Sequence, residues 1–461
     1  MALDDIRKIK LEKLAALRAA GIDPYPATSR RDASVAQALE HFDAWAESKK
    51  TVTLAGRIMA RREHGGSIFF DISDDGARIQ CFAKEDTLGG DDFKMFKELF
   101  DIGDFIEVEG FLFRTKKDER TLEVQRCAML AKALLPLPEK WHGLQDVEDR
   151  FRKRYLDLLF NDDVRATFYR RSMVIGALRD FLTQHGFLEV STPALQPLYG
   201  GASARPFKTH MHALDIDLFL RIAPELYLKR LLVGGMDKVF EFTTNFRNEG
   251  MDRDHNPEFY ALEFYAAYKD LDWLIDFTED LLRAAVKKVY PTGIVIHEGR
   301  EIDFNKPFGR AKFSDLLSDY QDGKEADETF KKNIRPTLVE PTFVVDWPTE
   351  LLPLAKKTSY DPKLVSTFQF FAGGLELIKA FSELNDPIDQ RERFAAQESS
   401  RAKGDEEAQR MDEDFIEALE YGMPPAAGWG LGLDRFVMLL TDSHSIRDVL
   451  LFPTMKPKKD D

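Results

Sequence analysis

The sequence predicts an α+β protein in which a five-stranded β-barrel precedes a larger domain of antiparallel strands flanked by helices. Three observations support this prediction. Apolar residues alternate with polar ones over 51–137, recur at helical spacing after a proline-punctuated segment, and form an aromatic-rich hairpin over 238–268. We expect four parts: a helical extension over 1–50, the barrel over 51–137, a linker over 138–160 and the large domain over 161–461. A subdomain is expected to be inserted into the large domain near 291–340.

The N-terminal extension has apolar residues at helical spacing over 3–20, and the Gly-Ile-Asp-Pro sequence at 21–24 ends that helix. A second short helix is expected around 35–47. Lysine and arginine fill the outer face of the first helix, and two interpretations stay open. The helix is either a solvated cap or a contact surface for an RNA partner.

The barrel prediction comes from five short strand patterns between 51 and 130, with a hairpin turn at Asp75-Gly76 and a helix over 91–99 between the third and fourth strands. This is the outline of an OB-fold, which binds single-stranded nucleic acid through aromatic and basic side chains. Most phenylalanines would be core residues in any barrel. The candidates for nucleic-acid contact are Arg57, Arg61, Phe70, Arg78, Gln80 and Phe82.

The hairpin at 238–268 has a charged loop at 250–257, and Arg247 lies just before the turn. A guanidinium there can grip a phosphate or carboxylate through two parallel hydrogen bonds, and Phe259 offers a face on which a base can stack. The alternative is a solvated hairpin whose charges form surface salt bridges.

Three further segments carry candidate chemistry. Glu225 lies near the start of a predicted helix. Glu376 and Glu383 are seven residues apart, on opposite faces of a regular strand, but a bulge would let both reach one site. Two such oxygen donors beside a triphosphate suit Mg²⁺, and Glu383 also suits a buried ammonium. Alternate glycines at 428–432 indicate a strand packed closely under a ligand, with Arg435 in the helix that follows.

Composition narrows the class of protein. The chain has 461 residues, 44% of them hydrophobic, and a net charge of −15, which argues against non-specific polyanion binding as the main activity. The two cysteines, Cys81 and Cys127, exclude a disulfide framework and a four-cysteine zinc site, and their scarcity indicates a reducing, cytoplasmic compartment. We expect no secretory signal and no membrane span, because the N-terminus is charged throughout and no run of about 18 apolar residues occurs.

The literal strings resemble one family. NFRNEG…HNPEF over 245–259 resembles motif 2 of class II aminoacyl-tRNA synthetases, GLGLDRFVML over 430–439 resembles motif 3, and the helix and strand ending at Pro193 resemble motif 1. ELYLKR and FSELNDP are similar to the lysyl branch. The phosphate-binding loop GxxxxGK[ST] and the class I signatures are absent. The resemblance implies a class II catalytic domain after the OB-fold, and a homodimer through motif 1.

The resemblance also implies the reaction and its residues. Lysine and ATP would give lysyl-adenylate, and the lysyl group would pass to the 3′-terminal adenosine of tRNA(Lys). Arg247 and Arg435 would be catalytic, and Glu376 and Glu383 would hold Mg²⁺. ATP would be bound by Arg247, Glu249, His255, Asn256, Phe259, Glu376 and Arg435. Lysine would be bound by Gly201, Glu225, Arg247, Glu263, Tyr265, Lys379, Phe381 and Glu383.

Four residues depart from the family pattern. Lys379 stands where lysyl enzymes generally carry Asn, and Gln369 stands where an Mg²⁺-binding Glu is usual. Asp254 replaces the Arg before the motif 2 His, and Arg126 falls near an anticodon-reading Glu. We therefore expect fewer Mg²⁺ ions than usual.

Other functions stay open at this point. The chain could be a paralogue that passes lysyl-adenylate to a protein or another non-tRNA acceptor, or a non-catalytic tRNA-binding module. The retained OB-fold counts against the first, and the intact Arg247 and Arg435 count against the second. An aspartyl or asparaginyl enzyme would share the architecture, but an acidic pocket suits a cationic substrate better.

Overall fold

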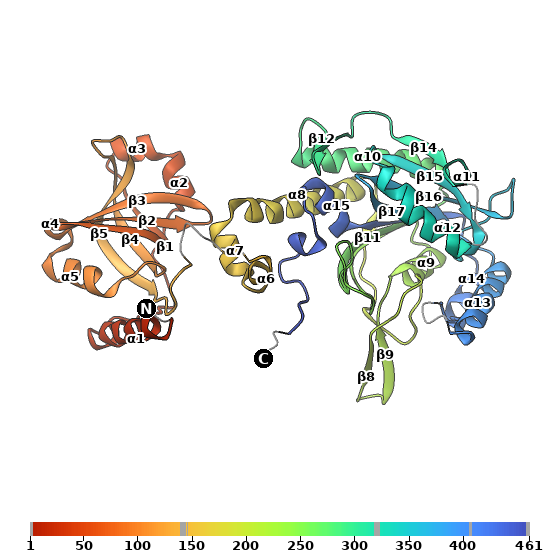
Figure 1. Cartoon of the computed structure of the whole chain (residues 1–461), viewed down its shortest axis with the longest axis horizontal. Helices are drawn as coiled ribbons and strands as arrows, with labels where there is room; N and C mark the ends of the chain where they lie inside the picture. The colour runs from red at the N-terminus through yellow and green to blue at the C-terminus, as the bar shows by residue number, and fades with distance from the viewer. Residues whose placement is uncertain (1–2, 139–143, 145, 318–322, 405–407, 458–461) are drawn as a thin grey trace. The chain divides into compact units, whose positions relative to one another are not determined.

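The computed structural model describes residues 3–138, 144, 146–317, 323–404 and 408–457. The chain forms two compact units, Met1–Asp146 and Val147–Asp461, so the division falls inside the predicted linker (Figure 1). Most of the linker after residue 146 is helical, in α6 (Val147–Arg152) and α7 (Arg154–Phe160), and belongs to the second unit.

The first unit is the predicted OB-fold, a closed barrel in the order β1-β2-β3-β5-β4. Asp75 and Gly76, with φ of 47° and 86°, form the expected hairpin turn between β2 and β3. The expected helix is α5 (Gly90–Leu99), preceded by α4 (Glu85–Leu88), between β3 and β4. The strands are β1 (Thr51–His64), β2 (Ser67–Asp74), β3 (Ala77–Lys84), β4 (Phe105–Arg114) and β5 (Arg120–Ala131).

The N-terminal extension holds three helices rather than the two expected. After α1 (Leu3–Ala19), the predicted helix around 35–47 is divided into α2 (Val35–Glu40) and α3 (Phe42–Glu47). The division falls at His41, whose φ of −96° and ψ of 15° depart from helical values. Ser34 begins α2 with a capping box formed with Gln37.

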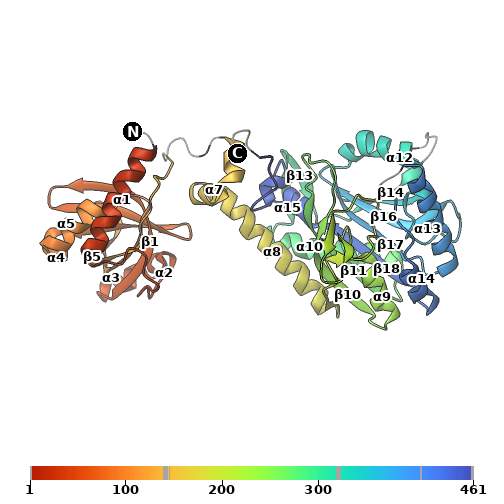
Figure 2. The same cartoon turned by 90° about the horizontal axis from the view of Figure 1, so that it is seen from below.

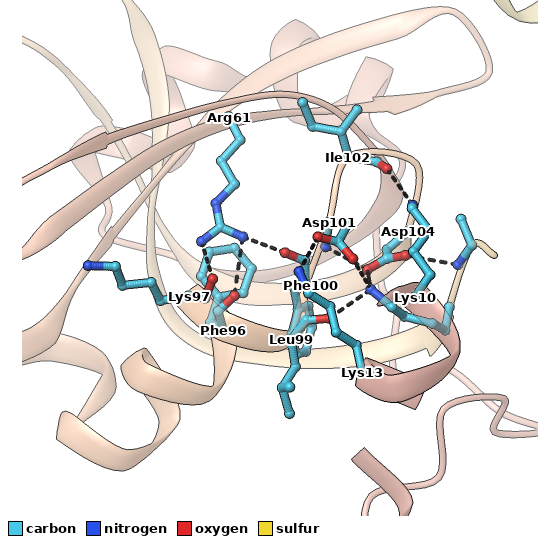
Figure 3. Close-up of polar contacts among 12 residues, drawn as sticks. Lys10, Lys13, Arg61, Phe96, Lys97, Leu99, Phe100, Asp101, Ile102 and Asp104 are labelled. Atoms are coloured by element: carbon cyan, nitrogen blue, oxygen red, sulfur yellow. Dashed lines mark hydrogen bonds and ion pairs between the residues drawn. The ribbon is translucent and has the colours of Figure 1, made fainter. Parts of the chain in front are cut away.

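Helix α1 is fastened to the barrel by charged side chains (Figure 3). Lys132 is fully buried and contacts Asp104 at 2.8 Å and Asp101 at 2.6 Å. From α1, Lys13 contacts Asp101 at 2.6 Å, and Lys10 donates to the carbonyl of Ile102. Two of the basic residues of α1 therefore bind groups of the barrel, which favours the interpretation of this helix as a cap.

The second unit is built on an eight-stranded sheet in the order β14-β15-β16-β17-β18-β11-β10-β6. Neighbouring strands are antiparallel except at the two edges, where β14 runs parallel to β15 and β6 to β10. The strands are β6 (Leu188–Glu189), β10 (Lys238–Phe246), β11 (Glu258–Ala267), β14 (Gly309–Lys312), β15 (Thr342–Pro348), β16 (Leu364–Ala372), β17 (Leu375–Ser382) and β18 (Ala426–Gly432).

One face of this sheet packs against helices α8 (Asp162–Gln184) and α10 (Leu271–Val289), which lie side by side (Figures 1 and 2). Its buried side chains include Phe264, Trp429 and Phe370. The other face is partly covered by α9 (Glu225–Val233), α13 (Pro387–Ala402) and α14 (Glu413–Glu420), and α15 (Leu433–Leu440) follows β18.

Segment 291–340, where we expected an inserted subdomain, shares the core of this unit. Its strand β14 extends the large sheet, and Val295, Ile302 and Phe304 pack in the same core as the central strands. Its elements otherwise are β12 (Ile294–His297), β13 (Arg300–Asp303), α11 (Phe313–Leu316), α12 (Gly323–Thr329), a π-helical turn (Phe330–Ile334) and a 3₁₀ turn (Arg335–Thr337).

A separate small sheet in the order β7-β9-β8 contains β7 (Leu195–Gln196), β8 (Lys208–Met211) and β9 (Ile216–Leu220). Short 3₁₀ turns at Thr349–Leu351 and Ile446–Val449 complete the unit. None of the helices in the described ranges is both long and apolar enough to cross a membrane.

Candidate active site

The site has a floor of three glycines on β18. Gly428 pairs with Tyr265 and Phe381 on its two neighbouring strands, and Gly430 pairs with Glu263 and Lys379. Residues paired across strands project from the same face, so the glycines lie among side chains of both neighbours. A Cβ at Gly428 would overlap the Glu383 carboxylate and lie 2.6 Å from Cε1 of Tyr265. The missing side chain at Gly428 therefore makes room for the Glu383 carboxylate and the ring of Tyr265.

A β-bulge sets the face on which Glu376 lies. Phe370 pairs with Ile378, whereas the next residue of β16, Phe371, pairs with Glu376, so Leu377 is an extra residue on β17. The extra residue shifts the alternation, and Glu376 comes to the same face as Lys379. This is the irregularity that the sequence required for Glu376 and Glu383 to share a face.

Arg247 leaves β10 at the edge of this floor. Its guanidinium lies 5.0 Å from the ring centre of Phe259, which pairs with Asn245 across the hairpin. Its Nε is buried without a hydrogen-bond partner among the described residues. An orphaned donor on a buried cation indicates a missing anion, such as a phosphate or carboxylate. Burial lowers the pKa of Arg247, although Glu249 opposes this.

Arg435 forms a second cationic position with His255. Its Nη2 lies 2.8 Å from Nε2 of His255, and the other ring nitrogen of the histidine contacts Asp252 at 2.8 Å. Next to Arg435, the buried Asp434 binds Arg171 of α8 at 2.5 Å and accepts from the backbone N–H of Tyr260 at 2.7 Å. These bonds fix the start of α15 against the hairpin.

An acidic pocket closes the opposite end of β17. Glu383 and Glu225 are buried, and Glu263 and Tyr265 line the same space, with 3.2 Å between the Tyr265 hydroxyl and Glu263. Burial raises the pKa of Glu263 to about 8, and the neighbouring Glu225 adds to the rise. Burial and the other carboxylates likewise raise the pKa of Glu383.

The same pocket holds a cation that the sequence reasoning missed. Lys229 of α9 is completely buried, contacts Glu225 at 2.6 Å and forms an ion pair with Glu383. It also lies 5.4 Å from the ring centre of Phe381. The spacing of Glu225 and Lys229, four residues apart on a predicted helix, was the available signal.

Glu376 belongs to a different electrostatic environment. Its carboxylate lies 3.5 Å from Nζ of Lys379, which is 47% exposed. Burial opposes ionisation of Glu376, but Lys379, Arg435, Lys331 and Arg335 outweigh it and hold its pKa at about 2. Gln369 pairs with Lys379 on the neighbouring strand.

The expectation that Glu376 and Glu383 together hold Mg²⁺ stays a prediction, and each carboxylate has a cation partner in this structure. Glu376 lies at the start of β17 beside Lys379, whereas Glu383 follows the end of that strand and is paired with Lys229. The described residues contain no group of three or more acidic, histidine or cysteine side chains arranged for a metal ion. Glu376 lies next to Arg435, which donates to its backbone carbonyl at 3.3 Å.

The remaining predicted residues lie around these groups. Gly201 has a φ of 85°, and a Cβ there would lie 2.9 Å from Cβ of Glu225, so it packs directly against the acidic pocket. Asn256 is buried and donates to the carbonyl of Glu258, while Glu249 is exposed beyond Arg247. Asp254 accepts from Arg435 through its backbone carbonyl at 3.3 Å.

The barrel corrects one predicted nucleic-acid contact. Phe70 is 1% exposed and lies in the core, because its neighbours Ile68 and Ile72 point inward with it. The aromatic side chain of β2 on the outside of the barrel is that of Phe69, whose ring centre lies 4.4 Å from that of Phe82 on β3 in a stacked arrangement. The ring centre of Phe113 lies 6.3 Å from that of Phe82.

The other predicted contacts of the barrel divide by exposure. Arg78 is exposed. Arg57 and Arg61 are engaged, since Arg57 donates to the carbonyl of Gly103, and Arg61 caps the end of α5 (Figure 3). Gln80 donates to Thr121. The departing residue Arg126 pairs with Glu107 at 3.2 Å.

Comparison with known proteins agrees with this architecture. A family model described as tRNA synthetases class II (D, K and N) matches residues 146–456, and one described as OB-fold nucleic acid binding domain matches residues 52–130. The lysine–tRNA ligase of Carboxydothermus hydrogenoformans is 48% identical over 99% of this chain and 99% of its own length. Those of Moorella thermoacetica and Thermotoga maritima are 46% and 43% identical, over 100% and 99% of this chain and 99% and 97% of their own lengths. The two family models and the full-length relatives agree. The chain therefore belongs to the class II tRNA synthetases of the D, K and N family.

Proposed function

We propose that the protein activates L-lysine with ATP and transfers the lysyl group to the 3′-terminal adenosine of tRNA(Lys). The observation that carries this proposal is a buried acidic pocket, next to an orphaned buried arginine, over a floor of glycines. The pocket suits a cationic side chain, and the arginine suits a carboxylate or phosphate. The relatives are lysine–tRNA ligases, which points to the same substrates.

The reaction has two steps in which the protein mainly stabilises charge. An oxygen of the lysine carboxylate attacks the α-phosphorus of ATP, and pyrophosphate leaves. The ribose hydroxyl then attacks the lysyl carbonyl, and AMP leaves. Arg247 binds the attacking carboxylate and the α-phosphate, Arg435 and His255 bind the outer phosphates, and the ring of Phe259 supports adenine, with Glu249 at its amino group.

The amino-acid end of the site holds both ammonium groups of lysine. Glu225 and the backbone of Gly201 receive the α-ammonium, and Glu383 receives the ε-ammonium with Tyr265 and Glu263 nearby. Phe381 flanks the aliphatic chain. Arg247, between this pocket and the phosphates, aligns the carboxylate with phosphorus, and such alignment lowers the barrier by fixing the two reactants together.

Mg²⁺ fits this site as an ion held mainly by ATP. Mg²⁺ prefers few protein carboxylates together with phosphate oxygens; Glu376, ionised beside Arg435, would supply one and Glu383 the other. Bound with ATP, Mg²⁺ would neutralise phosphate charge. Because Gln369 is uncharged and Lys379 already lies against Glu376, we propose that fewer ions bind than in enzymes with a glutamate at 369. Counting Mn²⁺ bound with ATP by electron paramagnetic resonance tests this, and a gain of one ion in Lys379→Asn is expected.

The barrel would bind the anticodon through its outer aromatic face. Phe69 and Phe82 are partly exposed and stacked, and Lys84 lies 5.0 Å from the ring centre of Phe82. Stacked rings and a cation suit single-stranded bases. We propose that the exposed Arg78 on the same strand also contacts the anticodon.

We also propose a homodimer through α8 and the segment that follows it. Exposed apolar side chains in this region include Met173, Leu188, Leu195 and Leu214, and β6 is an edge strand of the large sheet. Sedimentation velocity should give a dimer, and Leu188→Glu should shift it toward the monomer. ATP, lysine and tRNA meet in the cytoplasm, which we propose as its compartment.

The test of the proposed activity is amino-acid-dependent ATP–pyrophosphate exchange with each of the twenty amino acids, followed by tRNA charging. Lysine alone should support exchange. Arg247→Ala should slow it by about 10²–10³-fold, whereas Arg310→Ala, at a surface ion pair, should leave it unchanged. Exchange without charging of tRNA(Lys) would favour a protein-modifying paralogue, and no exchange with lysine would favour a tRNA-binding module.

A further inference from the structure

The 3₁₀ turn Arg335–Thr337 packs against the start of β17. The N–H of Gly374, in the turn that joins β16 to β17, donates to the carbonyl of Leu338 at 3.0 Å. A Cβ at Gly374 would lie 3.5 Å from Cα of Pro336, so the two backbones are in direct contact. These contacts hold the 3₁₀ turn beside the segment that leads into Glu376.

The side chain of Arg335 reaches from this turn to the loop between β10 and β11. Its Nη2 lies 3.7 Å from the carboxylate of Asp254, which is close enough for an ion pair and too far for a hydrogen bond. Its Nε is buried and has no hydrogen-bond partner among the described residues. A buried donor without a partner is costly, so Arg335 has hydrogen-bonding capacity that its surroundings leave unused.

Asp254 connects Arg335 to the cations already assigned to the phosphates. Its backbone carbonyl accepts from Nε of Arg435 at 3.3 Å, and Arg435 also donates to the carbonyl of Glu376. The next residue, His255, contacts Nη2 of Arg435 at 2.8 Å. Asp254 therefore lies between two arginines, with one at its backbone and the other at its side chain.

A carboxylate in this position would by itself oppose the binding of a triphosphate. Only 14% of the Asp254 side chain is exposed, so water screens its charge weakly. The adjacent Arg253 lies 3.5 Å from this carboxylate through its Nε, but its terminal nitrogen binds Glu298 at 2.6 Å, and half of its side chain is exposed. Arg335 is thus the cation that faces Asp254 with donors to spare.

We propose that Arg335 binds the outer phosphates of ATP together with Arg435 and His255, and that Asp254 is a positioning residue that directs Arg335 toward them. The inference rests on the proposed function, because it assigns a further cation to the ATP end of the same site. A guanidinium can form two parallel hydrogen bonds with a phosphate group, and the loose ion pair with Asp254 leaves its donors free to do so. AMP lacks the outer phosphates, so Arg335 contributes to the binding of ATP and not to that of AMP.

Calorimetry of the full-length protein with ATP and with AMP, each in the presence of Mg²⁺, tests this assignment. Arg335→Ala should raise the Kd of ATP by about tenfold or more and leave the Kd of AMP unchanged. Lys332→Ala removes a cation from an exposed position in the preceding π-helical turn and should match the wild type with both nucleotides. Arg253→Ala should raise the Kd of ATP less than Arg335→Ala does. Normal ATP binding in Arg335→Ala, or an equal loss of ATP and AMP binding, overturns the assignment.

A charge exchange tests the role of Asp254. Arg335→Glu places two carboxylates together and should weaken ATP binding more than Arg335→Ala does. Adding Asp254→Arg restores a pair of opposite charges and returns a guanidinium to the same place, so it should recover most of the lost affinity. No recovery in a folded double variant overturns the shared position of the two residues.

Arg335→Lys keeps the charge and loses the planar fork, so it provides a second variant if Arg335→Ala does not fold. It should weaken ATP binding less than Arg335→Glu does and again leave AMP binding unchanged; normal ATP binding in this variant overturns the use of two parallel hydrogen bonds. The nucleotide comparison needs no amino acid. A wild type that binds ATP through Arg335 but does not support exchange with lysine would therefore overturn the proposed function and leave this assignment intact.

Discussion

Replacing Gly428 by alanine tests whether the glycine floor is needed for lysine binding. The added Cβ would overlap the Glu383 carboxylate and lie 2.6 and 2.9 Å from two ring atoms of Tyr265. Ordinary contacts of this kind are about 3.4–4 Å, so the ring and carboxylate must each move. Overpacking of this kind costs about 1–3 kcal/mol, and displacing Glu383 from Lys229 would add to the cost.

The affected groups are those that we propose receive the lysine side chain, so the cost should appear in lysine binding. A loss of about 1–3 kcal/mol corresponds to an increase of about 5- to 140-fold in the KM for lysine. The assay is ATP–pyrophosphate exchange with lysine and ATP varied separately. The KM for ATP should change little, because the atoms nearest to the new methyl group belong to Glu383 and Tyr265.

Gly430→Ala is the matched control on the same strand. Its Cβ would meet Cγ of Glu263 at 3.5 Å, an ordinary contact, so the protein need not rearrange. The free energy of unfolding should fall by about 1–3 kcal/mol in Gly428→Ala and by less than about 0.5 kcal/mol in Gly430→Ala. A Gly428→Ala protein with normal stability and a normal KM for lysine would refute the placement of the amino-acid pocket over this glycine.

Three further predictions concern other parts of the molecule. Phe82→Ala should weaken tRNA binding by about 1–3 kcal/mol without changing pyrophosphate exchange; an unchanged KM for tRNA would contradict stacking on this ring. Lys132→Met should destabilise the barrel by about 3–5 kcal/mol by leaving Asp104 buried and unpaired, seen as faster hydrogen exchange in the first unit, while Lys97→Met should have no such effect. Arg435→Ala should raise the KM for ATP by about tenfold or more with little change for lysine, and an equal rise for both would argue for general disruption of the site.

Local patterns predicted much of the fold. Alternation predicted the five barrel strands, helical spacing predicted α1, and turn residues predicted the hairpin turn at Asp75. The choice of Phe70 was wrong although the same alternation contained the answer, since Ile68 and Ile72 already required Phe70 to face the core. The same alternation places Phe69, the neighbour of Phe70, on the outer face of the barrel.

The site was less accessible to sequence reasoning because it depends on contacts between distant segments. Literal motifs pointed to Arg247 and Arg435. The bulge at Leu377 has no clear local signal, yet it decides which face Glu376 occupies. The pairing of Lys229 with Glu383 joins residues more than 150 positions apart, and only the packing of α9 over the end of β17 brings them together.

The two ends of β17 each carry a lysine–glutamate pair, and their different burial gives them different roles. At the start of β17, where we propose that ATP binds, Lys379 is 47% exposed and lies 3.5 Å from Glu376. Water and salt screen this ion pair, so a cation bound with ATP would replace the ammonium at little cost. At the other end of β17, the side chains of Lys229 and Glu383 are fully buried, and separating them would leave each charge buried and unpaired. We therefore expect the exposed pair to separate when ATP binds with a cation, and the buried pair to stay intact. Replacing Lys379 should therefore change the dependence of exchange on Mg²⁺, and replacing Lys229 should change which amino acids support exchange.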